Sequence, residues 1–298
     1  MTSPTIIDTP CALQAEADRE RAAGHRIALV PTMGALHEGH LSLVKVARAR
    51  ADKVWVSIFV NPTQFNDPDD FDHYPVDLER DLALCEAHGV DLVFTPTAAV
   101  LYPEGAQTWV DVDRLSLPLC GATRPGHFRG VTTVVTKLFL AARPHVAVFG
   151  EKDFQQLAVI RRMQQDLGFG IEIVGAPTLR EADGVAMSSR NVRLGPEARR
   201  QAVSLVRALD AAEHVIANGE TGRDAVLSVV REMLGKADQG RVDYAELRDP
   251  ENLELAPAEL DRPTLLALAV HFDPDPDGRG SEVRLIDNRV LLPRRPGA

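Results

Sequence analysis

The feature that most constrains the fold of this chain is an abrupt change of pattern near Pro31. Residues 27–30 are aliphatic without polar alternation, which is typical of a short buried parallel strand, and the run ends at the proline. From about Gly39 onward, apolar side chains recur at helical spacing with Lys and Arg between them. A buried strand that leads through a glycine-containing turn into an amphipathic helix predicts the first half of a right-handed βαβ unit.

The turn itself, residues 31–40, contains groups suited to binding phosphate. Gly34 and Gly39 allow a backbone to approach a ligand closely. His37 and His40 lie three residues apart at the start of the predicted helix, where backbone N–H groups and the helix dipole attract anions. We interpret the turn as a nucleotide-phosphate site. Taken alone, it is equally well explained by a turn glycine, a helix-entry glycine and two surface histidines.

A second strand is predicted at residues 54–60, and it runs into Asn61-Pro62-Thr63-Gln64. Ligands of open parallel sheets bind beyond the carboxyl ends of the strands, so the amides of Asn61 and Gln64 fall where substrate contacts are expected. For this motif alone, a helix cap followed by a solvated loop is the better explanation. The acidic residues 66–71 that follow predict a turn-rich loop.

Residues 119–130 predict a loop, from their glycine and proline content, that presents Arg124, His127 and Arg129. Two arginines before a predicted helix favour a polyanion, and a basic surface turn is the alternative. The preceding residues 108–112 alternate in polarity and predict a strand near the sheet edge.

The pattern of strand, glycine, polar cluster and helix occurs again at residues 146–157, with Gly150-Glu151-Lys152-Asp153 in the turn. Lys152 would act as a point charge on a phosphate, and Gln156 lies about one helical turn deeper. Further on, Met187-Ser188-Ser189-Arg190 offers two hydroxyls and a guanidinium to an anion. Alone, that segment would be an ordinary serine-rich turn.

The C-terminal third has a different order of predicted helices and strands. A helical pattern begins at Pro196 and a second one follows it, and three strands are then predicted, at 242–247, 265–272 and 283–286. The acidic residues 273–280 between the last two strands do not fit an EF-hand and predict a solvated hairpin loop.

We therefore predict an α/β protein with a Rossmann-like parallel-sheet domain over residues 1–178. A smaller C-terminal α+β domain, acting as a lid, is predicted over residues 179–298.

Composition limits the classes of partner. The net charge of −10 argues against general electrostatic binding to nucleic acid, although a local cationic pocket can still bind a small anion. No apolar run approaches the roughly 20 residues that span a bilayer, and the N-terminus lacks a basic region followed by an apolar one, so we expect a cytoplasmic chain without a membrane partner. The cysteines Cys11, Cys85 and Cys120 are widely spaced and are expected to be reduced, and no Cys/His set has zinc spacing.

Five of these segments, in this order, resemble the pantothenate synthetase (pantoate–β-alanine ligase) family of the His-x-Gly-His nucleotidylyltransferase superfamily. They are PTMGALHEGH at 31–40, SIFVNPTQF at 57–65, RPGHF at 124–128, GEKD at 150–153 and MSSRN at 187–191. LIDN at 285–288 extends the resemblance over nearly the whole chain, and residues 273–280 look longer than is usual in the family.

The resemblance implies an ATP-dependent condensation of pantoate with β-alanine, which yields pantothenate, AMP and diphosphate through a pantoyl-adenylate. The catalytic residues would be His40, His37, Lys152 and Arg190, with His40 as proton donor at the leaving group. Gln64 and Gln156 would hold pantoate, with Asn61 and Arg124 as further substrate contacts. The residues around ATP would be Met33, Gly34, Ala35, Leu36, His37, Glu38, Gly39, His40, Gly150, Glu151, Lys152, Asp153, Leu179, Met187, Ser188, Ser189 and Arg190.

The chemistry fits these residue types, because a carboxylate that attacks phosphorus needs alignment and relief of negative charge rather than a protein nucleophile. Mg²⁺ is expected on ATP, held by phosphate oxygens and water rather than by protein side chains alone. The family is usually homodimeric, so a homodimer is expected.

Three rival functions fit less well. A nucleotidylyltransferase that acts on a phosphate would need more Arg or Lys than the Asn61–Gln64 loop has. An ATP-binding regulatory module would not require both His40 and Lys152. A tRNA synthetase is disfavoured by the acidic charge and by the absence of an anticodon-sized domain.

Overall fold

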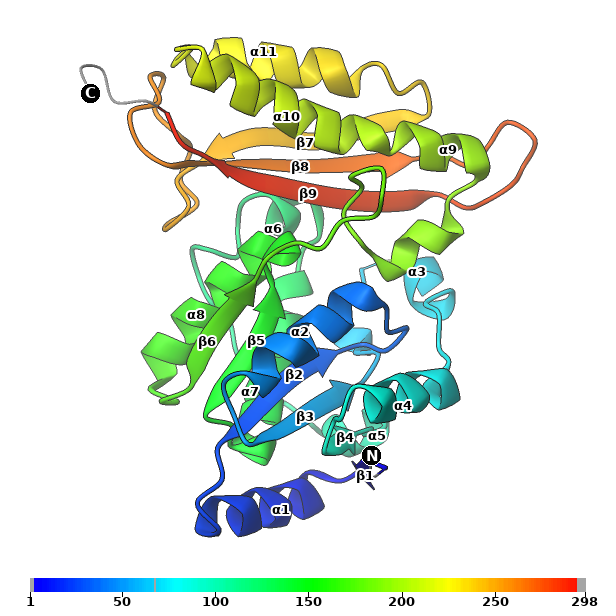
Figure 1. Cartoon of the computed structure of the whole chain (residues 1–298), viewed down its shortest axis with the longest axis vertical. Coiled ribbons are helices and arrows are strands. Elements are labelled where there is room, and N and C mark those ends of the chain that lie inside the picture. The colour runs from blue at the N-terminus through cyan, green and yellow to red at the C-terminus, as the bar shows by residue number, and fades with distance from the viewer. Residues whose placement is uncertain (1–2, 67, 294–298) are drawn as a thin grey trace. The chain divides into compact units, whose positions relative to one another are not determined.

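The computed structural model of the chain describes residues 3–66 and 68–293 (Figure 1). The chain divides into two compact units, Met1–Leu179 (unit 1) and Arg180–Ala298 (unit 2). This division falls one residue after the domain boundary predicted from the sequence.

Unit 1 is built on a six-stranded sheet in which neighbouring strands are parallel and the order is β1-β4-β3-β2-β5-β6. The chain runs outward from β2 to β4 and then returns to place β5 on the other side of β2. Open parallel sheets bind ligands at such a reversal of strand order. The predicted Rossmann-like parallel sheet is therefore confirmed. The strands are β1 (Thr5–Ile7), β2 (Ile27–Thr32), β3 (Lys53–Ile58), β4 (Leu92–Phe94), β5 (Val146–Gly150) and β6 (Glu172–Ala176).

Strand β2 continues through Pro31, where we expected it to end. The Thr32 carbonyl accepts from Phe59 N–H on the β3 side, so the backbone of Pro31, one residue earlier, faces the opposite side. The paired register with β5 on that side ends at Leu29. A proline, which has no N–H to donate, is tolerated there for this reason.

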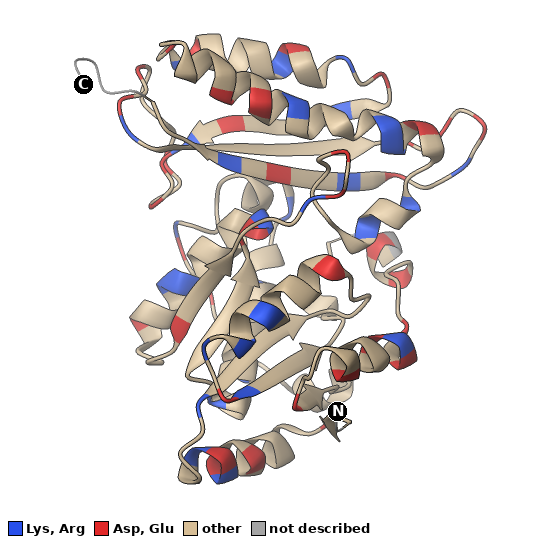
Figure 2. Ribbon diagram, in the orientation of Figure 1, with Lys and Arg blue, Asp and Glu red and all other residues tan. Residues whose placement is uncertain are grey.

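Helices cover both faces of the sheet of unit 1 (Figure 1). α2 packs against β2, β3 and β5, whereas α1 and α7 pack against each other and against β2. Figure 2 shows that β2 and β5 carry no charged residue, as strands buried on both faces require. The helices are α1 (Pro10–Ala22), α2 (Glu38–Arg48), α3 (Pro68–Asp72), α4 (Leu78–Ala87), α5 (Ala98–Leu101), α6 (Cys120–Thr123), α7 (His127–Ala142) and α8 (Phe154–Leu167), with short 3-10 helices η1 (Pro62–Gln64) and η2 (Glu151–Asp153).

Alternate residues of the strands form the two halves of this core. Ala28 and Val30 of β2 pack with Val44 of α2 in one hydrophobic cluster. Their neighbour Leu29 and the large side chain Trp55 of β3 are each 1% exposed. Burial of a side chain of this size stabilises the fold by roughly 1.5–3 kcal/mol, so the strands are held from both faces.

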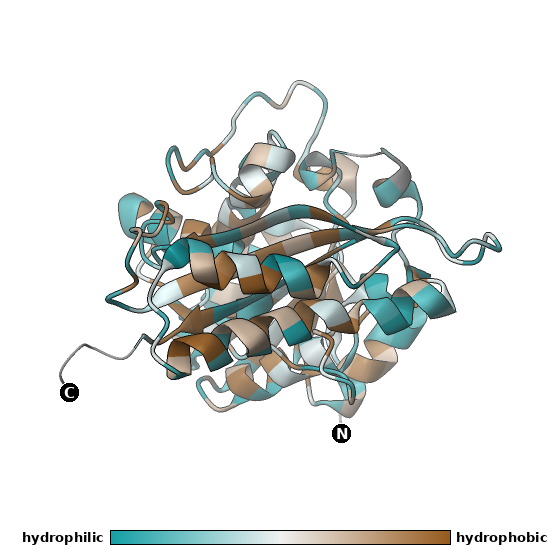
Figure 3. Cartoon of the chain, turned by 90° about the horizontal axis from the view of Figure 1, so that it is seen from above, coloured by the Kyte–Doolittle hydropathy of each residue, from teal (hydrophilic) through white to brown (hydrophobic). Residues whose placement is uncertain are grey.

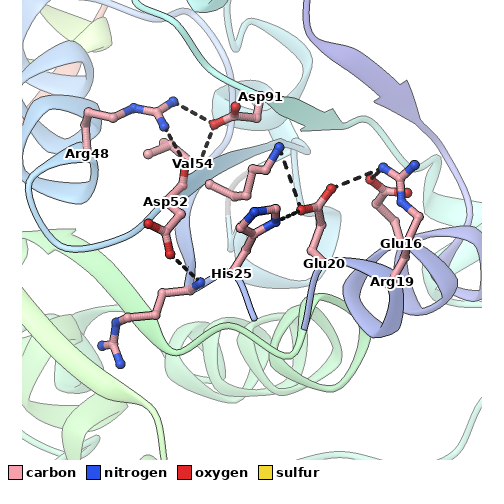
Figure 4. A network of polar contacts seen from close by, with 10 residues as sticks. Glu16, Arg19, Glu20, His25, Arg48, Asp52, Val54 and Asp91 are labelled. Atoms are coloured by element: carbon pink, nitrogen blue, oxygen red, sulfur yellow. Dashed lines mark hydrogen bonds and ion pairs between the residues drawn. The ribbon is translucent and has the colours of Figure 1, made fainter. Parts of the chain in front are cut away.

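Charged residues at the amino ends of the strands are paired with one another (Figure 4). Asp52 accepts from the backbone N–H of Arg26 (2.8 Å), and Asp91 accepts from that of Val54 (2.7 Å). Arg48 forms an ion pair with Asp91 (2.6 Å). These charges therefore hold the starts of the strands, at the edge opposite the carboxyl ends.

Residues 108–112 are irregular, so the strand predicted there is wrong. The N–H of Val110 donates to Thr133 Oγ1 (3.0 Å), and its carbonyl accepts from Thr132 Oγ1. Side chains of α7 thus satisfy the backbone groups that a neighbouring strand would otherwise have paired.

Two predicted loops of unit 1 contain helices. The turn-rich residues 66–71 overlap α3. Helix α7 begins at His127, four residues before the predicted start at residue 131, directly after Gly126 with φ 83°. His127 is consequently a helical residue rather than a loop residue.

Unit 2 is a three-stranded antiparallel sheet in the order β7-β8-β9, covered by two long helices, and the predicted α+β class is confirmed. β8 is buried along almost its whole length, and α10 packs against it and against α11. Figure 3 shows that these helices carry both hydrophobic and hydrophilic residues. The single helix predicted from Pro196 is divided near Ala202 into α9 and α10. The elements are η3 (Ser189–Arg193), α9 (Pro196–Gln201), α10 (Val203–Ala217), α11 (Arg223–Leu234), β7 (Gly240–Arg248), β8 (Thr264–Phe272) and β9 (Val283–Leu291).

The β8–β9 hairpin, which we predicted to be solvated, contains a buried carboxylate. Asp275 is 4% exposed and accepts from the N–H groups of Glu197 (3.1 Å) and Ala198 (3.0 Å) in the first turn of α9. Gly195, the N-cap residue of that helix, has no side chain that could accept from these N–H groups. A Cβ built there would lie 2.4 Å from the Asp275 carboxyl carbon. The hairpin therefore supplies the cap of α9.

Among the described helices, none combines the length and hydropathy that a membrane-spanning segment requires.

Candidate active site

The turn between β2 and α2 brings the predicted phosphate site to the carboxyl end of the central strand. Gly34 has φ 86° and Ala35 has φ 50°, so the chain reverses through two successive left-handed residues. The N–H of Gly34 donates to Thr32 Oγ1 (3.2 Å). Helix α2 then begins at Glu38 with His37 as its N-cap.

The two histidines of this turn cap the helix with their own rings. Nδ1 of His37 accepts from the N–H of Gly39 (3.1 Å), and Nδ1 of His40 accepts from the N–H of His37 (3.3 Å). A ring nitrogen that accepts carries no proton, so each neutral ring has its proton on Nε2. The ring centroids are 4.1 Å apart. The helix start therefore holds two neighbouring Nε2–H donors in a defined tautomer.

The backbone of the turn is used differently from what we expected. The N–H groups of His37 and Gly39 are bound by the histidine rings, and those of Ala35 and Leu36 donate to the Asp81 carboxylate at 2.8 and 2.7 Å. These four N–H groups are therefore not phosphate donors in this conformation. The Nε2–H groups of the two rings are candidate donors to an anion.

The electrostatics of His40 link this turn to the residues that follow β5. Burial, and after it the neighbouring His37, lower the pKa of His40 to about 3, so the ring is neutral at pH 7. Asp153 raises and Lys152 lowers the same pKa, which requires both charges to lie within electrostatic reach of the ring. Lys152 is 3.6 Å from Asp153, and its side chain is 18% exposed. The structure thus brings His37, His40 and Lys152 together.

Asn61 is the centre of a hydrogen-bonded cluster after β3. Its side chain is buried, and Nδ2 donates to Gln64 Oε1 (3.0 Å) and to the Gly130 carbonyl (3.2 Å). Its Oδ1 accepts from the hydroxyls of Thr63 (2.9 Å) and Tyr102 (3.0 Å). These bonds occupy both polar atoms of Asn61, and one of them orients the Gln64 side chain. We did not predict Tyr102, because nothing in its local pattern distinguishes it.

Gln64 is held from three sides. Its Nε2 lies 3.0 Å from Met33 Sδ, which connects the amide to the phosphate turn. Its backbone carbonyl accepts from Arg124 Nη2 (3.1 Å) and is 2.7 Å from His127 Nδ1. Arg124 thus reaches the backbone of Gln64, and the structure brings Met33, Gln64 and Arg124 into one neighbourhood.

Two consecutive glutamines after β5 have different environments. Gln155 is 6% exposed, accepts from the N–H of Cys120 (3.0 Å), and donates to the carbonyls of Leu115 (3.0 Å) and Pro118 (2.6 Å). Gln156 is partly exposed. Gln155 is therefore structural, whereas the predicted substrate residue Gln156 follows β5 at the same distance as Gln64 follows β3.

The Met187–Arg190 segment lies in unit 2, where several contacts shape it. Ser188 caps η3, with its Oγ accepting from the N–H of Arg190 (3.2 Å). The side chain of Asn191 donates to Glu181 Oε1 (2.6 Å). The hydroxyls and the guanidinium of the segment are therefore presented by a short, anchored helix.

The predicted ATP-binding residues are divided between the two units. Leu179, the last residue of unit 1, is 39% exposed, whereas Ser188, Ser189 and Arg190 belong to unit 2. That Arg190 shares a cavity with the two histidines stays a prediction.

The sequence as a whole matches one family. Residues 5–290 match the Pantoate-beta-alanine ligase family. The chain belongs to the pantoate–β-alanine ligase family. The resemblance noted in the sequence is therefore confirmed over almost the entire chain.

Curated relatives of the chain share its full length. It is 54% identical over 290 residues to the pantothenate synthetase of Geobacter sulfurreducens, covering 96% of this chain and 98% of the relative. It is 52% identical over 299 residues to that of Anaeromyxobacter dehalogenans, covering 98% and 100%. The reaction of the family is the ATP-dependent condensation of pantoate with β-alanine, and the chain is a ligase of this type.

Solved structures show the same fold. Pantothenate synthetase from Thermus thermophilus superposes with a TM-score of 0.89 at 44% identity, covering 97% of this chain and 100% of that one. The pantoate–β-alanine ligase from Francisella tularensis, complexed with Beta-gamma ATP and β-alanine, superposes with a TM-score of 0.77 at 30% identity, covering 96% and 97%.

Proposed function

We propose that the chain makes pantothenate in two steps through a pantoyl-adenylate. In the first step an oxygen of the pantoate carboxylate attacks the α-phosphorus of ATP, and diphosphate leaves. In the second step the amine of β-alanine attacks the acyl carbon, AMP leaves, and the amine loses a proton. The observation that carries the proposal is the pair of Nε2–H imidazoles with Lys152 within electrostatic reach.

In the first step, His37, His40 and Lys152 bind the phosphates from unit 1. Ser188, Ser189 and Arg190 supply the corresponding donors from unit 2. His40 acts as a neutral hydrogen-bond donor, because a ring with a pKa of about 3 holds no second proton to release at pH 7. Its Nε2–H therefore stabilises the negative charge on the departing diphosphate. The other residues of 33–40, 150–153 and Leu179 surround the nucleotide.

Pantoate binds between Gln64 and Gln156, whose amides follow the two strands that flank β2. Neutral amides suit a carboxylate that must stay nucleophilic, because a direct cation would stabilise the ground state as well as the transition state. Asn61 orients the Gln64 side chain, and Arg124 holds the Gln64 backbone.

Mg²⁺ accompanies ATP and neutralises charge on its phosphates. In the part of the chain that the structure describes, no group of three His, Cys, Asp or Glu side chains could hold a metal ion. The ligands of Mg²⁺ would be mainly phosphate oxygens and water.

Assembly, location and the role of unit 2 are part of the proposal. A homodimer is supported by the family resemblance, and Trp109, Leu117 and Leu140 of unit 1 are exposed hydrophobic side chains. A cytoplasmic location is supported by the free thiols of Cys11 and Cys85. Unit 2 acts as a lid that brings Arg190 to the nucleotide. Sedimentation equilibrium tests the first point and cell fractionation the second.

An isotope experiment tests the adenylate. Pantoate labelled with ¹⁸O in its carboxylate transfers one labelled oxygen to AMP in each turnover, because that oxygen stays on phosphorus when the amine attacks carbon. Pantoate alone should support exchange between diphosphate and ATP, and β-alanine alone should not. Label in inorganic phosphate, or exchange that requires β-alanine, would overturn the mechanism.

Two substitutions test the residue roles. His40→Asn keeps an acceptor for the His37 N–H but removes the Nε2–H donor, and Lys152→Met removes a charge. Each should slow the pantoate-dependent exchange by about 10²–10³-fold while the far-ultraviolet circular dichroism is retained. Near-normal exchange in both variants would refute these roles.

A further inference from the structure

The turn that carries the histidines adopts a conformation that its own sequence disfavours. Gly34 and Ala35 have φ values of 86° and 50°, and an alanine with positive φ is uncommon because its Cβ crowds the following carbonyl. Such a backbone persists only where the surrounding structure over-determines it. Some other part of unit 1 must therefore hold this turn.

Two consecutive residues of α4 do so. The Asp81 carboxylate accepts one bond on each oxygen, from the N–H of Ala35 (2.8 Å) and the N–H of Leu36 (2.7 Å). Arg80 Nη1 donates to the carbonyl of Leu36 (3.1 Å). The peptide groups on both sides of the strained residue are thus bound by side chains from a helix that lies 45 residues further along the chain.

The fit of Asp81 against the turn is close. Its side chain is 1% exposed, and this burial raises the pKa of the Asp81 carboxyl, against which the two backbone donors act. A Cβ on Gly34 would lie 3.0 Å from Asp81 Oδ2 and 3.1 Å from Ile58 Cγ2. A glycine at 34 leaves the carboxylate the space that it needs to reach both N–H groups. A buried carboxylate with two backbone donors is a defined interaction rather than an incidental surface contact.

The position of the turn decides where the histidines are. His37 follows Leu36 directly, and His40 is tied to His37 through its Nδ1. A shift of the Leu36 peptide would therefore move both rings as a unit. Since a misplacement of about 1 Å can cost 10²-fold in rate, the support of the turn matters to catalysis.

We propose that Asp81 is a positioning residue for the adenylation step, which holds the Gly34–Leu36 turn so that His37 and His40 direct their Nε2–H groups at the same phosphates. The inference rests on the proposed function. Both oxygens of Asp81 accept from the turn itself, so its role is to position the turn rather than to contact the nucleotide. Arg80 binds the next peptide group, through the carbonyl of Leu36.

Asp81→Asn tests the proposal, with Asp77→Asn as the matched control. The asparagine amide can accept only one of the two N–H groups and turns its own NH₂ toward the other. Asp77 carries the same charge on the same helix, where it caps α4 by accepting from the N–H of Arg80 (3.0 Å), and asparagine caps equally well.

The expected result is a fall of about 10- to 100-fold in kcat/KM for ATP in the pantoate-dependent exchange, with KM for ATP raised. In the complete reaction, KM for β-alanine should change less than about twofold, since the amine attacks after diphosphate has left. Asp77→Asn should retain the wild-type values.

The outcomes separate positioning from mere folding. If Asp81→Asn loses activity only in proportion to its unfolded fraction, with an unchanged KM for ATP, the positioning role is overturned. If it matches Asp77→Asn, the role is also overturned. If wild type itself shows no pantoate-dependent exchange, the proposed function fails instead.

Arg80→Met keeps the inference testable if Asp81→Asn does not fold. The Arg80 side chain is 55% exposed and lies 4.0 Å from the buried Asp81 carboxylate, which keeps its two backbone donors when Arg80 is removed. It should raise KM for ATP by about two- to fivefold through the loss of one hydrogen bond to Leu36. An unchanged KM for ATP in Arg80→Met, beside an unfolded Asp81→Asn, would reject the proposal.

Discussion

His40 should stay neutral through the pH range in which most histidines titrate, and the protein should lose stability in mild acid because of it. Burial and the neighbouring His37 lower the pKa of His40 from 6.5 to about 3. In the unfolded chain the same ring takes up a proton near pH 6.5. Between these two values the unfolded state binds one proton more than the folded state.

The sign of the effect follows from this difference. Stability contributed by the neutral ring is fully present above pH 6.5 and is lost progressively as the pH falls toward 3. The slope is about 1.4 kcal/mol per pH unit within the window, which amounts to at most about 2 kcal/mol between pH 7 and pH 5.

The perturbation that isolates this contribution is His40→Asn, which lacks the titrating group. Urea unfolding at pH 7 and pH 5, followed by the fluorescence of the buried Trp55, gives the free energy of unfolding of unit 1 for both proteins. Wild type should lose up to about 2 kcal/mol more than His40→Asn on this change of pH.

Nuclear magnetic resonance gives a direct check. The ¹³Cε1 signal of His40 should stay constant between pH 8 and pH 5. A titration of that signal near pH 6.5, or the same loss of stability in wild type and His40→Asn, would refute the assignment of a neutral Nε2–H donor.

Three further predictions concern residues that support the two units. Gly130→Ala should raise KM for pantoate despite the higher helix propensity of alanine, because its Cβ would lie 2.4 Å from the Thr63 carbonyl beside Gln64; steady-state kinetics with an unchanged KM would contradict this. Arg180→Met should destabilise unit 2 by about 3–5 kcal/mol, since it leaves the buried Asp287 without its bidentate partner, and thermal unfolding at wild-type temperature would disprove it. Asp275→Ala should lower the urea midpoint of unit 2 by uncapping α9, whereas an unchanged midpoint would show that the cap is dispensable.

Much of the parallel sheet could be predicted because β2, β3 and β5 are short apolar runs that lead into a proline, glycine or polar cluster, whereas the edge strand β1 was not predicted. The periodicity of buried strands and amphipathic helices is a property of a short stretch of sequence. It can therefore be recognised without knowing which elements pack against that stretch. The strand predicted at residues 108–112 failed for the same reason. Its alternating pattern is real, but its backbone partners are hydroxyls of Thr132 and Thr133, which no local rule indicates.

The site was predictable where the chemistry lies in contiguous motifs, and less so where distant residues support it. His37, His40 and Lys152 stand in turns that follow apolar strands. Asp81 lies in α4, and the polar residues of that helix are typical of a solvent-exposed face. One signal could have identified it: Asp81 and Cys85 are both buried, four residues apart on one face of α4, so a carboxylate lies on the inward stripe of the helix.

The environment of Asn61 was the second point that local reasoning missed. An asparagine after a strand is an ordinary cap in most sequences, and it does accept from the N–H of Thr63. Its other bonds reach Tyr102 and Gly130, which lie 41 and 69 residues further along the chain. Long-range hydrogen bonds of this kind decide whether an amide contacts substrate or holds the residue that does.

The hairpin that caps α9 has an evolutionary consequence. Gly195 leaves space for the carboxylate of Asp275. That carboxylate accepts from the first N–H groups of α9, which Gly195 has no side chain to bind. Hairpin length and the identity of residue 195 should therefore vary together across the family. Homologues with a shorter hairpin need serine, threonine or aspartate in place of that glycine, and an insertion in one part of the gene is compensated some eighty codons away.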